Sequence, residues 1–131
     1  MKRFLLACFL LTATCTVSFV GHTSAQMVAP TPTTLAAFTA KVNLMDSQIG
    51  AGDLASAQAT WLEVHSMMIN VLAVSKYSIY SATTPADKTA HETILGNQRT
   101  IYYQVWALKP DLATNRVAIH TKLNAFGATI Y

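Results

Sequence analysis

The segment Leu62–Ile69, which reads LEVHSMMI, places one histidine and two methionines within four consecutive residues. A His imidazole and a Met thioether can together ligate haem iron or copper, whereas Met is also a common filler of apolar cores. Whether His65, Met67 and Met68 form a ligand site depends on which of them face the interior of the fold. The elements that carry them must therefore be placed first.

Apolar residues recur every three or four positions along four segments, and this spacing predicts amphipathic helices. No segment alternates apolar and polar residues with a period of two, so we expect no β-strand. The helices are expected at about residues 34–49, 54–81, 85–108 and 112–130.

Turn and capping residues separate these helices. Gly50 and Gly52 interrupt the apolar pattern, and Asp53 follows as a cap for the second helix. Thr84-Pro85-Ala86-Asp87 offers an N-cap threonine, a proline at the first helical position and an acid three residues later. Asp111, after Pro110, is expected to cap the fourth helix. The short connections predict an all-α, up-down-up-down antiparallel four-helix bundle.

The second expected helix is much longer than the first. At 1.5 Å per residue, the two helices span roughly 42 and 25 Å. Either the second helix breaks near Ser75–Ser78, or its end projects beyond the first helix. The Pro/Thr-rich leader, residues 26–33, is placed to cover such a projection.

The first 25 residues have the layout of a secretory signal peptide. Lys2 and Arg3 precede the apolar run Phe4–Val20, and small residues at Thr23 and Ala25 suit a signal peptidase. We expect cleavage after Ala25 and a secreted or periplasmic protein. The alternative is that the segment is retained as an uncleaved membrane anchor.

Cleavage would change the global properties of the chain. It leaves 106 of the 131 residues, the size of one domain, and removes both cysteines, Cys8 and Cys15. Seven basic and six acidic residues remain, so the basic pI belongs mostly to the signal segment. We therefore expect neither nucleic-acid binding nor stable membrane anchoring.

The histidines are poorly placed for a shared metal ion. Counted from the turns at one end of the bundle, His65 and His120 differ in height by about 4.5 Å, and His91 lies at least about 9 Å further away. The acidic residues form no Glu-x-x-His pair of the kind that binds metals in carboxylate bundles. No metal site is expected.

In size, expected compartment and expected architecture, the chain resembles exported four-helix bundles that hold haem b between a Met on the first helix and a His on the last. That resemblance implies Met45 and His120 as haem ligands, although residue counting places them at heights that differ by about 6 Å. The sequence has no Cys-x-x-Cys-His motif for covalent attachment. We expect no cofactor, and the alternative function is that of a haem- or metal-binding four-helix bundle that resembles an electron carrier.

His65 lies at the edge of the predicted apolar face of its helix, and the sequence leaves its burial undecided. A buried imidazole requires a hydrogen-bond partner. Asn97, Gln98 and Arg99 on the third helix lie at a comparable height and are the expected partners.

The sequence carries no catalytic constellation. Ser66 follows His65 directly and points away from it, and the acidic residues are scattered. The aromatic residues are more informative, because half-exposed Tyr and Trp suit binding to proteins. We therefore expect a non-enzymatic, exported protein with a binding or protein-interaction role, whose ligand the sequence does not name. A protein partner and a second copy of the chain are the candidate partners. The expected interaction surface comprises Tyr77, Tyr80, Tyr103 and Trp106.

Overall fold

The computed structural model describes residues 28–131; the expected signal peptide and both cysteines lie outside this range. The described residues form four helices and no strand, which confirms the predicted all-α four-helix fold. Each helix packs against the next along the chain, and the first also packs against the last. The helices are α1 (Leu35–Gly50), α2 (Leu54–Ser81), α3 (Pro85–Leu108) and α4 (Arg116–Gly127).

The starts of α2 and α3 are fixed by the predicted capping residues. The Asp53 carboxylate accepts a hydrogen bond from the backbone N–H of Ser56 at 3.1 Å. Before it, Gly52 adopts a φ of 78°, which favours glycine. The Thr84 hydroxyl accepts a hydrogen bond from the backbone N–H of Asp87 at 3.1 Å, and Pro85 is the first residue of α3. Local sequence therefore determines both boundaries.

The start of α4 was predicted wrongly. The Asp111 carboxylate caps a single turn, where it accepts from the backbone N–H of Thr114 at 2.9 Å, and the helix begins only at Arg116. Between them, Asn115 Nδ2 donates to the Leu108 carbonyl at 2.9 Å and ties the turn to the end of α3. Leu112 is nevertheless buried, so the apolar periodicity continues through residues that are not part of the helix.

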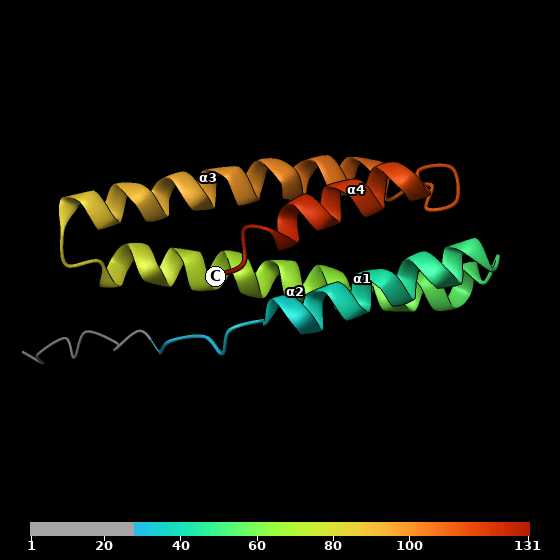
Figure 1. Ribbon diagram of the computed structural model, residues 1–131, viewed down its shortest axis with the longest axis horizontal. Helices are drawn as coiled ribbons and strands as arrows, with labels where there is room; N and C mark the ends of the chain where they lie inside the picture. Colours follow the sequence, from blue (N-terminus) through green and yellow to red (C-terminus); the bar gives the residue numbers. More distant parts are fainter. Residues whose placement is uncertain (1–27) are drawn as a thin grey trace, which may run out of the picture.

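The four helices surround one apolar core. The turns that join α1 to α2 and α3 to α4 lie at one end of the molecule, and the α2–α3 turn lies at the opposite end (Figure 1). Most of the core lies nearer the first end, where all four helices meet. Its largest fully buried apolar side chains are Phe38, Met45, Trp61, Met68, Ile119, Leu123 and Phe126.

Helix α2 is continuous through Ser75–Ser78, so its end projects together with the start of α3 (Figure 1). Ser75 is the last buried residue of α2 before the α2–α3 turn, and Leu95 is the first buried residue of α3 after it. Residues 76–94 contain no buried side chain. We call this two-helix projection the hairpin overhang (residues 76–94).

The leader and the C-terminal tail (residues 128–131) meet over the middle of α2 and α3. The Thr33 backbone N–H and hydroxyl both donate to Asn70 Oδ1, at 3.1 and 2.9 Å. Gln98, which is fully buried, donates from Nε2 to the Thr129 carbonyl at 3.3 Å. Leader, tail and Gln98 line a cavity of about 10 Å³. The leader therefore covers α2 where the four-helix packing gives way to the overhang.

Candidate functional site

The most distinctive group of side chains lies between α2 and α3. Trp61 and His65 stand one turn apart on α2, and Tyr102 and Trp106 stand one turn apart on α3, so each pair shares a helix face. Tyr103 joins them through an edge-on contact with Tyr102, at a ring separation of 5.4 Å. We call these five residues the aromatic cluster.

His65 is the centre of the cluster. Its ring centroid lies 5.1 Å from that of Trp106, 5.7 Å from that of Tyr102 and 6.1 Å from that of Trp61. Its Nε2 lies 2.9 Å from the Tyr102 hydroxyl, and the imidazole is half-buried. The histidine is thus held on three sides by aromatic rings and by one hydrogen bond.

The expected hydrogen-bond partners of His65 were wrong. Asn97 and Arg99 are exposed, and the Gln98 amide bonds instead to the tail at Thr129. Counting residues along a helix gives the height of a side chain but not the direction in which it points. Tyr102, one turn from Gln98 on α3, lies at the height of His65 and also points toward it.

The outer side of the aromatic cluster is exposed. Tyr103 is 66% exposed and Trp106 is 45% exposed. On α2, Leu62 and Ile69 lie three and four positions from His65, on the same side of the helix, and are also exposed. Neither was selected from the sequence, although their spacing from His65 was the signal available. These four exposed residues flank the aromatic cluster on the two packed helices, and we call them the aromatic surface (Leu62, Ile69, Tyr103 and Trp106).

The other two tyrosines of the expected interaction surface lie elsewhere. Tyr103 stands 18 residues after Pro85, about 27 Å along α3 from the α2–α3 turn. Tyr80 is close to that turn and largely exposed, and Tyr77 is half-buried in a shallow pocket beside Val28. The structure therefore divides the four aromatic residues between two places.

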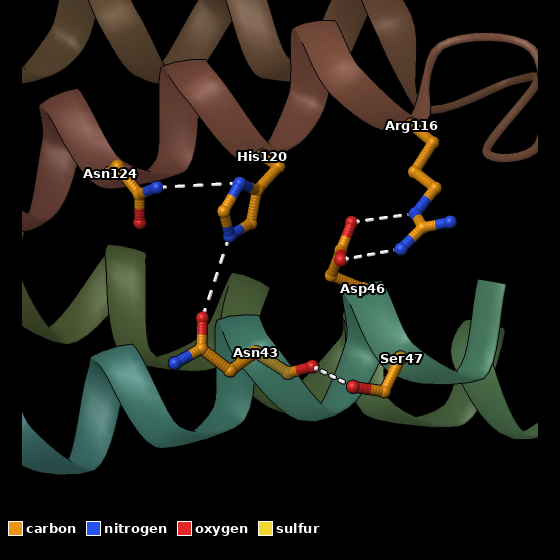
Figure 2. Close-up of polar contacts among 6 residues, drawn as sticks. All are labelled: Asn43, Asp46, Ser47, Arg116, His120 and Asn124. Carbon is orange, nitrogen blue, oxygen red and sulfur yellow. Dashed lines mark hydrogen bonds and ion pairs between the residues drawn. The ribbon is translucent and has the colours of Figure 1, made fainter. Parts of the chain in front are cut away.

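The two expected haem ligands occupy different surroundings. Met45 on α1 is almost fully buried in the core. On α4, His120 Nε2 lies 3.5 Å from Asn43 Oδ1, and its Nδ1 lies 3.4 Å from Asn124 Nδ2 (Figure 2). Both ring nitrogens of His120 are thus directed at polar side chains near the surface, and the structure does not bring them to the Met45 thioether.

The same side of the molecule carries an ion pair that joins α1 to α4. Arg116 Nε and Nη2 donate to the two carboxylate oxygens of Asp46 at 2.8 and 2.7 Å (Figure 2). These hydrogen bonds hold the pKa of the Asp46 carboxyl below its usual value, against the partial burial that raises it. We call the contacts of Asn43, Asp46, Arg116 and His120 the α1–α4 seam.

The His/Met segment of α2 divides between core and surface. Met68 is fully buried, Met67 is half-buried against the core, and His65 belongs to the aromatic cluster. Within residues 28–131, no three His, Cys, Asp or Glu side chains are grouped closely enough to hold a metal ion. The segment therefore contributes packing and one hydrogen-bonded imidazole.

The described helices also show whether this part of the chain could cross a membrane as a helix. Among residues 28–131, no helix is both long enough and apolar enough to cross a bilayer.

Comparison of the chain with protein-family models, with curated proteins and with solved structures gives no match.

Proposed function

We propose that this protein is a non-catalytic binding module whose aromatic surface recognises a protein partner. The observation that carries the proposal is the exposure of Trp106 and Tyr103 beside two exposed aliphatic residues of α2. Trp and Tyr are the residues that most often dominate the binding energy of protein interfaces.

The packing of Trp106 supports the same proposal. Trp106 contacts His65 and the buried Trp61, at ring separations of 5.1 and 6.4 Å, and Lys109 Nζ lies 5.3 Å from its ring centroid. An anchor that is already held in place loses little conformational entropy on binding. A polar group at the edge of an apolar surface, here Lys109 beside Trp106, is typical of interfaces between proteins.

The proposal also includes export and topology. A signal peptide cut after Ala25 would deliver the domain to the periplasm or the cell exterior. The domain would then act there as an antiparallel up-down-up-down bundle. Intact-mass measurement of the exported protein tests the cut directly, since a retained segment adds the mass of 25 residues.

Capture from the native envelope tests the binding role. Trp106→Ala and Tyr103→Ala should each reduce the recovery of the same partner, because truncation removes an anchor from the centre of the surface. Val117→Ala is the matched control, since Val117 is an exposed apolar residue on α4, away from the aromatic surface. Circular dichroism should show the same helicity for all three variants.

Two results would count against the proposal. Unchanged recovery with both aromatic variants would show that this surface is not the one used. A partner identified as a second copy of the chain, with self-association lost in both variants, would make the aromatic surface a homo-oligomer interface instead.

A further inference from the structure

A second site lies along the hairpin overhang and the residues of α3 that directly follow it, apart from the aromatic surface. An open cleft of about 640 Å³ runs between the end of α2 and the first half of α3. Its volume is in the range of sites for small organic ligands. We call it the hairpin cleft, and it is lined by Lys76, Ile79, Tyr80, Ala82, Lys88, Glu92, Leu95, Gly96 and Arg99.

The charge of the cleft is unbalanced. Lys76, Lys88 and Arg99 line it together with one acid, Glu92. Within residues 28–131, none of these three cations has a carboxylate within 4.0 Å. Lys109 and Lys122 on the rest of the described bundle are also unpaired, but only in the cleft do three such cations line one concave place. Unpaired cations concentrated in one concave place attract an anion.

The less exposed part of the cleft is apolar. Leu95 is almost fully buried and Ile79 is half-buried, and both line the cleft. Lys76 Nζ lies 6.0 Å from the centroid of the Tyr80 ring, at the rim. The cleft therefore offers an apolar floor with positive charge around it.

Gly96 keeps one wall of the cleft open. Glycine is among the least favourable residues inside a helix, and the backbone here does not require it, since only Gly52 among the described residues has a positive φ. A Cβ added at Gly96 would meet no atom within 4 Å. The part of the cleft wall that Gly96 lines is thus open, and a larger side chain at this position has room to project from it.

We propose that the hairpin cleft binds a single-chain amphipathic anion, with the anionic head among Lys76, Lys88 and Arg99 and the alkyl chain along Ile79 and Leu95. A carboxylate and a phosphate monoester share this chemistry. The site is independent of the aromatic surface, which lies further along α3.

Calorimetric titration with decanoate, decyl phosphate and decyltrimethylammonium, each below its critical micelle concentration, tests the proposal. The two anions should bind with one-to-one stoichiometry and weaken as salt is raised, and the cation should not bind. Gly96→Leu should weaken decanoate binding at least about tenfold without lowering Tm, because the added side chain fills the cleft and favours the helix. Arg99→Gln should also weaken binding.

Two controls accompany these variants. Lys122→Gln removes a positive charge from α4, outside the cleft, and Trp106→Ala alters the aromatic surface. Both should bind decanoate as the native protein does. Binding of the cationic amphiphile with similar affinity, or native affinity in Gly96→Leu, would overturn the proposal. So would sedimentation with phosphatidylglycerol vesicles in the absence of decanoate binding, because charge alone would then be recognised.

Discussion

The two ends of the molecule are built differently. At the end where all four helices meet, Trp61, Phe38 and Phe126 are buried. The Asp46–Arg116 ion pair joins α1 to α4, the one pair of contacting helices among the described residues that no short turn connects. At the other end, only α2 and α3 remain (Figure 1). The hairpin overhang has no buried side chain of its own.

This difference separates stability from binding. Burial of large apolar side chains supplies most of the stability of a small domain, and here it is concentrated at the four-helix end. The overhang contributes little burial but holds unpaired cations beside half-buried apolar residues. Substitutions at the two ends should therefore have opposite consequences for folding and for ligand binding.

The largest expected effect contrasts one side chain from each end. Trp61→Ala should lower the free energy of unfolding by about 3–5 kcal/mol, because it empties the centre of the core. Ile79→Ala, in the overhang, should lower it by less than about 1 kcal/mol, since the side chain is only half-buried. Urea denaturation followed by circular dichroism measures both. A loss of similar size in the two variants would show that the overhang is part of the cooperative core.

A smaller effect is expected at Gln98, where the four-helix packing gives way to the overhang. Its Oε1 is buried and has no hydrogen-bond partner among the described residues. Gln98→Met should raise the free energy of unfolding by about 1 kcal/mol, because it removes an unsatisfied buried amide at similar volume. Gln98→Glu, which places a charge at the same position, should lower it. Destabilisation by the Met variant would show instead that the bond to Thr129 outweighs the unsatisfied oxygen.

The smallest effect concerns the α1–α4 seam and depends on pH. Because the pKa of Asp46 is lowered in the folded state, mainly by its hydrogen bonds from Arg116, its ionised form stabilises the fold. This contribution is complete above the carboxyl's unfolded pKa of about 3.9 and is lost as the pH falls through the lower folded value. Asp46→Asn should therefore lower the free energy of unfolding by less than about 1 kcal/mol at pH 7.

Denaturation of the native protein and of Asp46→Asn at several pH values checks that sign. Their difference should stay constant from pH 7 to about 5 and should shrink below about pH 4, when Asp46 is protonated. A difference that grew on acidification would contradict the assigned origin of the stabilisation. Thr121→Ala on the exposed side of α4 is a suitable control, since it carries no charge.

Features with a local cause could be read from the sequence. The caps at Asp53 and Thr84 depend on residues within three positions, and both were predicted correctly. The buried residues of α1, Phe38, Val42, Met45 and Ile49, recur every three or four positions, which is the spacing from which the helix was predicted. The start of α4 failed because a buried Leu112 prolongs the apolar pattern through a turn.

Contacts between side chains of two different helices could not be predicted from the sequence. The pairing of His65 with Tyr102 depends on the rotation of α2 and α3 about their axes, which a count of residues does not give. The hairpin cleft combines Lys76 on α2 with Lys88 and Arg99 on α3. Lys88 and Arg99 lie about three helical turns apart and so share a face of α3, and Lys76 and Lys88 lie at similar distances from the α2–α3 turn. These signals give the heights of the three charges, but whether the two helix faces meet depends on the rotation of the helices.

The meeting of leader and tail has a consequence for chain connectivity. Pro32 and Tyr131 line the same small cavity, and a Cβ added at Gly127 would lie 3.4 Å from a methyl group of Leu35. The leader and the C-terminal tail of the bundle therefore lie close together. A circular permutant that joins the tail to the leader and opens the exposed turn at Thr83 would keep every helix pair. Retention of the native fold by this permutant would show that the order in which the helices are synthesised is separable from the arrangement in which they pack.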